Sequence, residues 1–140
     1  MLIGKTDYKD FERVPSGDFV AGEIVEVQEE KEHTFKGFEG AEDKVGPAVR
    51  LKFKLNGCEQ IHNTRWMKPS THEKSALYSK YIASLFLGIE PGMEFDTSKL
   101  KGLKVKTLWN DKEYQSIETI RPIGDKIDLS GKSKDEEVPF

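Results

Sequence analysis

The chain has 140 residues, a formal net charge of −3 at pH 7 and a single cysteine. This length predicts one domain with a modest core, and one cysteine excludes an internal disulfide framework and fits a cytoplasmic protein. No run of about 18 apolar residues and no basic, apolar leader occur, so we expect neither a membrane span nor a signal peptide.

Charge is segregated along the chain. Residues 18–43 carry nine acids against Lys31 and Lys36, a balance of −7. Residues 44–68 carry six cations against Glu59 alone, a balance of +5. A segregated basic segment is typical of a phosphate-binding face, although a solvated surface with compensating ion pairs would give the same pattern.

The first predicted elements are strands. Residues 17–28 are rich in strand formers and predict a first strand, in which Gly22 indicates a bend or bulge. A polar loop at 29–44 follows and holds two aromatics that no periodicity explains. Residues 45–55 form the clearest strand, because Val49, Leu51, Phe53 and Leu55 alternate with Arg50, Lys52 and Lys54.

Asn56-Gly57 predicts a tight hairpin turn into a third strand at 58–67. Ser70 or Thr71 can then cap an amphipathic helix of about four turns that ends at Gly88. Residues 103–109 and 113–121 predict a second hairpin, and residues 122–134 have the composition of a linker.

Three strands, a helix and two strands follow one another in the order of the OB-fold, a five-stranded barrel. An SH3-like barrel is the main alternative, but a helix after the third strand favours the OB-fold. The chain is therefore expected to be mainly β: an OB-fold domain at 1–123, with one helix between strands 3 and 4, and a flexible linker and acidic tail at 124–140.

An OB-fold binds single-stranded nucleic acid across its second and third strands, between the loop after strand 1 and the loop after strand 4. Phe53 is assigned to the core, Trp66 is expected to stack on a base, and Trp109 fits either role. For the two loop phenylalanines, packing on the barrel rim is the alternative. The candidate DNA-binding residues are Arg50, Lys52, Lys54, Arg65, Trp66, Lys68, Lys104, Lys106, Trp109, Lys112, Tyr114, Phe35 and Phe38.

Catalytic interpretations find little support in the sequence. Cys58 and His62 could ligate a metal, but a structural zinc site needs four ligands and no paired cysteine or histidine motif accompanies them. No glycine-rich phosphate loop or nucleophile elbow occurs. We therefore expect no metal, no cofactor and no enzymatic activity.

The last six residues are Asp135, Glu136, Glu137, Val138, Pro139 and Phe140. Such a tail suits binding to a partner, because the terminal ring and carboxylate fit an apolar pocket beside a basic residue. The arrangement resembles the C-terminal tip of bacterial and phage single-stranded DNA-binding proteins, and the size of the domain resembles the phage type.

That resemblance implies a protein that coats single-stranded DNA in replication, recombination or repair, in the cytoplasm of the host cell if a phage encodes it. The tail would recruit a helicase, polymerase, primase or nuclease. The linker is shorter than in bacterial members, and no tetramer interface is recognisable, so a homo-oligomer stays an open expectation. The alternatives are an adaptor or nucleic-acid-mimicking inhibitor that uses the acidic segment, and an RNA-binding OB domain.

Overall fold

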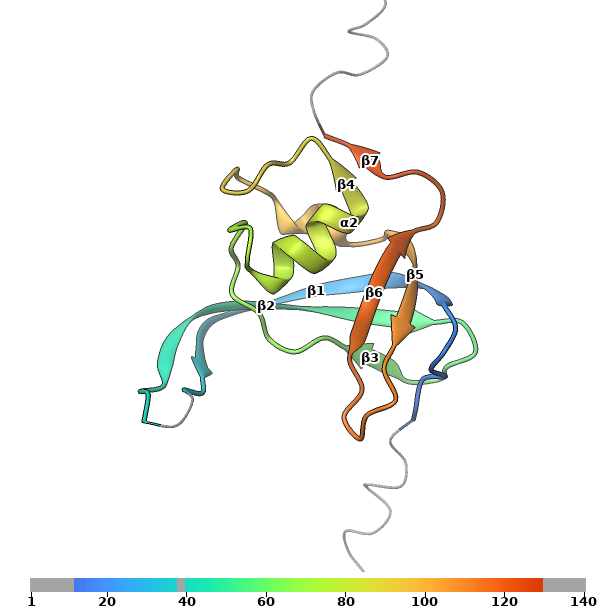
Figure 1. Ribbon diagram of the computed structural model, residues 1–140, viewed down its shortest axis with the longest axis horizontal. Coiled ribbons are helices and arrows are strands. Elements are labelled where there is room, and N and C mark those ends of the chain that lie inside the picture. Colours follow the sequence, from blue (N-terminus) through green and yellow to red (C-terminus); the bar gives the residue numbers. More distant parts are fainter. Residues whose placement is uncertain (1–11, 38–39, 130–140) are drawn as a thin grey trace, which may run out of the picture.

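The structure is a computed structural model that describes residues 12–37 and 40–129, and it is mainly β (Figure 1). Its main sheet has five antiparallel strands in the order β3-β2-β1-β5-β6. The predicted order of three strands, a helix and two strands is confirmed. The strands are β1 (Val20–Phe35), β2 (Lys44–Leu55), β3 (Ile61–Asn63), β5 (Lys104–Trp109) and β6 (Ile117–Pro122).

Strand β1 is longer than predicted and joins the two halves of the sheet. Its first residues pair with both β2 and β5, and its second half continues along β2 as far as Phe35 opposite Lys44. Residues 29–35 have weak strand propensity, but their pairing with β2 holds them in the strand. The loop predicted at 29–44 is therefore shorter in the structure. The outer part of this hairpin, described at residues 30–37 and 40–48, extends beyond the rest of the sheet (Figure 1); we call it the arm.

The alternation in β2 positions the core as predicted. Its four apolar side chains, from Val49 to Leu55, are all buried. Phe53 contacts the ring of Trp109 edge-on, with ring centroids 6.5 Å apart. Leu77 and Ile82 of the helix are buried in the same cluster.

A short helix lies between β3 and β5. It begins as a π-helix, η1 (Leu77–Ile82), and ends as an α-helical turn, α2 (Ala83–Leu85). The predicted start at Ser70 or Thr71 is wrong: the Ser70 hydroxyl accepts from the His72 N–H, and the Ser70 carbonyl accepts from the Ser75 hydroxyl. Such local bonds compete with helix formation. No helix of the described residues has the length and apolar character to cross a bilayer.

Two short elements complete the described fold. After the helix, β4 (Phe86–Leu87) pairs in parallel with β7 (Ile127–Asp128), and Leu129 packs against the core. The sequence predicted that the linker begins at residue 124. This prediction is wrong for residues 127–129, because Ile127 and Asp128 pair with β4 and Leu129 packs against the core. A 3₁₀ turn, η2 (Thr97–Leu100), precedes β5.

Strands β3 and β6 are the two edges of the sheet. Among the described residues no strand pairing joins them, so the closed barrel predicted from the element order is not seen. Residues 12–14 lie between the two edges instead. The backbone of Val14 exchanges two hydrogen bonds with the Gln115 side chain, and the Glu12 N–H donates to the Gln60 side chain.

Arg13 completes this bridge from the same segment. Its guanidinium donates to the carbonyls of Lys112 and Glu113 and pairs with the Asp111 carboxylate at 3.2 Å. The turn before β3 and the turn between β5 and β6 are thus held by one short stretch of chain. We call the contact of residues 12–14 with residues 58–62 and 110–115 the seam.

Candidate nucleic-acid interface

The register of β1 and β2 places the acidic segment directly against the basic one. Glu26 is opposite Lys52 and pairs with it at 3.5 Å, and Glu23 is opposite Lys54 and pairs with Lys104 of β5 at 2.5 Å. Charges that are separated along the chain therefore compensate each other across the sheet. Lys52 and Lys104 are less available to phosphate than the sequence suggested.

Two further predicted cations lie on the same outer face of the sheet. The Lys54 ammonium donates to the Cys58 carbonyl, and the Lys106 ammonium lies 5.6 Å from the centre of the Phe19 ring. Both side chains are exposed. These two lysines add positive charge to this face of the sheet. Among the described cation–ring contacts, however, neither of them lies over the Trp66 ring.

A different set of predicted residues does converge. The Arg50 guanidinium lies 4.6 Å from the centre of the Trp66 ring, and the His33 ring lies 5.2 Å from it. Phe35 packs edge-on against His33, and the Lys68 ammonium lies 5.9 Å from the centre of the Phe35 ring. We call these five residues the Trp66 cluster; it joins the arm to the segment after β3.

Beside it, a basic pocket of about 410 Å³ opens between β3, the helix and the β5–β6 turn. Its cations are Arg65, Lys80 and Lys112, and none of the described residues that line it is acidic. Lys80 donates to the Ile117 carbonyl at 2.7 Å, which holds its ammonium at the wall. Tyr114, 79% exposed, stands at the same wall and offers a free ring.

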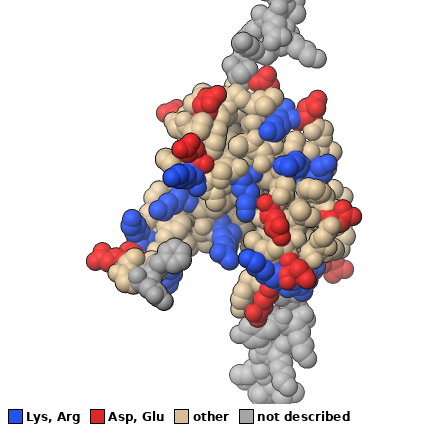
Figure 2. All heavy atoms as spheres, in the orientation of Figure 1, with Lys and Arg blue, Asp and Glu red and all other residues tan. Residues whose placement is uncertain are grey.

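The Trp66 cluster and the basic pocket belong to one surface. Asn63, in the pocket wall, is the cross-strand partner of Lys52, and Lys52 shares its face of β2 with Arg50. Figure 2 shows the surface hollowed between the arm and the β5–β6 end of the molecule, with Lys and Arg side chains along the hollow. Aromatic rings and cations at the edge of a hollow can hold stacked bases and their phosphates.

Trp109 does not belong to this surface. Its side chain is 3% exposed, and its indole N–H donates to the Thr107 hydroxyl at 2.8 Å. The stacking role is therefore wrong for Trp109, because its phase in β5 is that of the buried Val105 and Thr107. Phe35 takes part in the Trp66 cluster, whereas Phe38 and the tail at 135–140 lie outside the described residues.

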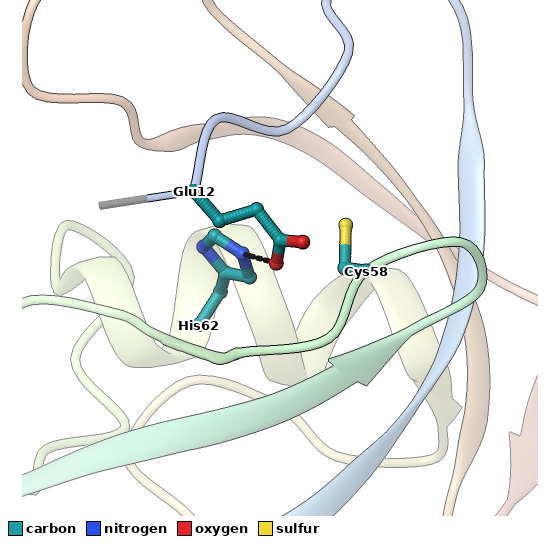
Figure 3. A group of neighbouring side chains, drawn as sticks. All are labelled: Glu12, Cys58 and His62. Carbon is teal, nitrogen blue, oxygen red and sulfur yellow. Dashed lines mark hydrogen bonds and ion pairs between the residues drawn. The ribbon is translucent and has the colours of Figure 1, made fainter. Parts of the chain in front are cut away.

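A second group of reactive side chains lies in the seam (Figure 3). The Glu12 carboxylate, the Cys58 sulfur and the His62 ring are all within 4.8 Å of one another. His62 contacts the Glu12 carboxylate through Nε2 at 2.9 Å. The backbone N–H groups of Glu59 and Gln60 donate to the same carboxylate.

These contacts change the acidity of the group. The Glu59 N–H, His62 and the Gln60 N–H stabilise the charged carboxylate and lower the pKa of Glu12 to about 2. Burial raises the pKa of the Cys58 thiol, and the neighbouring Glu12 charge adds to this effect. Glu12 is thus an anion and Cys58 a protonated thiol at neutral pH.

Sequence reasoning missed three residues of these two sites. His33 lies in a segment that the sequence predicted to be a loop. Lys80 lies in the predicted helix, and the sequence does not connect this helix to the predicted DNA-binding strands. Glu12 lies 46 positions before Cys58 and carries no motif. For His33 the sequence held a usable signal, because alternate residues of an extended segment share a face and His33 is two residues before Phe35. The contacts of Lys80 and Glu12 depend on tertiary structure.

No protein-family model, curated protein or solved structure matches this chain. Function is therefore inferred from the geometry of the site and the chemistry of its residues.

Proposed function

We propose that this chain is a single-stranded nucleic-acid-binding protein of OB-like architecture, and that its ligand is single-stranded DNA. The observation that carries the proposal is the surface formed by the Trp66 cluster and the basic pocket. It combines stackable rings with cations of a pocket whose lining, over the described part of the chain, holds no acidic residue. The element order, with a helix between the third strand and the last hairpin, supports the OB-like assignment.

The ligand would run from the arm across β3 toward the β5–β6 turn. Trp66 and Tyr114 offer rings to bases, while Arg65, Lys68 and Lys112 balance phosphates. Recognition by stacking and charge is largely independent of sequence, since every base has a stackable face. The chain would therefore coat single strands without catalysis, and binding would weaken steeply with salt.

The tail supports the choice of DNA and of a cellular role. By its resemblance to the tip of single-stranded DNA-binding proteins, Phe140 with the preceding acids would recruit a helicase, polymerase, primase or nuclease. The protein would then act in replication, recombination or repair. The mimic alternative is less favoured, because Glu23 and Glu26 of the acidic segment are already paired with lysines.

The first test is a fluorescence titration with oligo-dT at several salt concentrations, with duplex DNA and oligo-U in parallel. We expect tight, salt-dependent binding to oligo-dT, little binding to the duplex and weaker binding to oligo-U. Preference for oligo-U would favour the RNA-binding alternative. Absence of binding to all three would contradict the proposal and favour an adaptor.

Trp66→Ala is the matched test of the site. It should cost about 1–3 kcal/mol of oligo-dT binding, since a stacking platform is lost. Lys99→Ala is the control, because Lys99 lies in η2 and lines neither the pocket nor the Trp66 cluster. Equal affinities of the two variants would remove Trp66 from the interface.

A further inference from the structure

We propose that Glu12, Cys58 and His62 form a binding site for a transition-metal ion, with zinc as the best fit. The site lies in the seam and involves no residue of the proposed DNA-binding surface, so the inference does not depend on the proposed function. It rests on three ligand types that zinc prefers, brought together from two distant segments of the chain.

The geometry is close to what zinc needs. At ordinary bond lengths the ligand atoms of a tetrahedral zinc ion stand about 3.3–3.6 Å apart. Here the His62 Nε2 and Glu12 Oε1 atoms are 2.9 Å apart, and no pair within the group exceeds 4.8 Å. Side-chain adjustments of about 1 Å would therefore produce the site without a change of backbone.

The charges also fit a divalent cation. Glu12 contributes one negative charge, and Cys58 contributes a second when its sulfur bonds to the ion and its proton passes to solvent. His62 would coordinate as the neutral ring through Nε2, with its proton on Nδ1. Two anions and a divalent cation leave a neutral centre, which suits the buried positions of Cys58 and His62.

The surroundings provide support and space. The N–H groups of Glu59 and Gln60 hold the Glu12 carboxylate in place, as outer hydrogen bonds commonly do for metal ligands. A cavity of about 160 Å³, lined by Glu12 and His62, adjoins the group. It has room for a water molecule as a fourth ligand, the arrangement of a three-residue zinc site.

Such an ion would fasten the seam. Glu12 comes from the segment before β1, whereas Cys58 lies in the turn before β3 and His62 in β3 itself. A bond from the metal to each would connect these two parts directly. Metal binding should therefore raise the melting temperature of the protein, since only the folded chain brings the three ligands together.

The test uses the full chain and Co²⁺, which reports both thiolate ligation and tetrahedral geometry by absorption. The chelator-treated protein is titrated with Co²⁺ alone, then with Zn²⁺ in competition. We expect one equivalent to bind with a sulfur-to-cobalt charge-transfer band, and Zn²⁺ to displace it. Zn²⁺ should also raise the melting temperature by several degrees, and a chelator should reverse the rise.

Cys58→Ser and His62→Gln should each weaken binding at least tenfold, and Cys58→Ser should abolish the charge-transfer band. His72→Gln is the matched control, because His72 is exposed and is not part of the group. Saturable binding without that band in the wild-type protein, or no saturable binding, would overturn the proposal. The wild-type spectrum decides the question even if a variant fails to fold.

Discussion

Glu12 has an environment that strongly favours its charged form. Its pKa of about 2 in the folded chain lies below the usual 4.5, because backbone N–H groups and His62 favour the charged form. The unfolded chain takes up a proton near the usual pKa and the folded chain does not. The resulting stabilisation is therefore complete above pH 4.5 and is lost as the pH falls toward 2.

This predicts the behaviour of Glu12→Gln. With a chelator present, the variant should be less stable than the wild type at neutral pH. Its free energy of unfolding should also depend less on pH between 4.5 and 2. Denaturant titrations at a series of pH values measure both quantities. Parallel stability curves for the two proteins would show that the Glu12 charge does not contribute.

Residue-scale assignments from sequence succeeded where periodicity decides them. Phe53 is buried because alternate residues of β2 face the core, and the same rule places the half-buried Arg50 on the opposite face. For Trp109 the phase favours the core, but a strand-end tryptophan with an N–H donor also suits the surface, so periodicity alone did not decide its role. Its hydrogen bond to Thr107, two residues earlier, is what permits burial.

At the scale of elements, the pairing of β1 with β2 determines which basic side chains are available to bind phosphate. Lys52 faces Glu26, whereas Arg65 lines a pocket in which no acidic residue is found within the described ranges. Arg65→Gln should therefore weaken oligo-dT binding and reduce the salt slope by about 1, as expected when one phosphate contact is lost. Lys52→Gln should change both quantities less. Titrations over a range of salt concentrations compare the two variants, and a larger loss for Lys52→Gln would place the ligand on the paired face instead.

Gly22 allows β1 to approach β2 closely, because it has no Cβ atom. A Cβ atom at this position would lie 2.6 Å from the Lys54 carbonyl oxygen, a backbone atom that cannot easily move. Gly22→Ala should therefore destabilise the fold by about 1–3 kcal/mol. Gly46→Ala is the control, since nothing lies within 4 Å of the added atom. Thermal unfolding of both variants provides the measurement; equal melting temperatures would mean that the strands separate at little cost.

The prediction of elements was better than that of their contacts. The order of strands and helix along the chain and the turn after β2 follow from local patterns, so both could be predicted from the sequence. The compensation of Lys52 and Lys104 by acidic residues could not be predicted from the sequence, because it depends on the pairing of Glu26 and Glu23 with residues far along the chain. The late start of the helix depends on side-chain bonds of Ser70 and Ser75 that no periodicity reveals.

At the scale of the whole molecule, the tail and the basic surface have opposite charge. We predict that deletion of residues 135–140 tightens oligo-dT binding at low salt, because three acids then no longer compete with phosphate for the cations. The difference should vanish at high salt. Replacement of Phe140 alone by Ala is the control, since it keeps all three acids. Unchanged affinity on deletion would leave the tail as a partner-binding segment only.

The seam has a consequence for how the chain reaches its native state. Its hydrogen bonds join residues about 50 and 100 positions apart, so they form only after both hairpins exist. Until then residues 12–14 do not lie between β3 and β6, and these two edge strands are open to pairing with the edges of other chains. Refolding at high protein concentration should therefore yield aggregates at the expense of monomers, and a substitution that loosens Arg13 or Val14 should increase that loss.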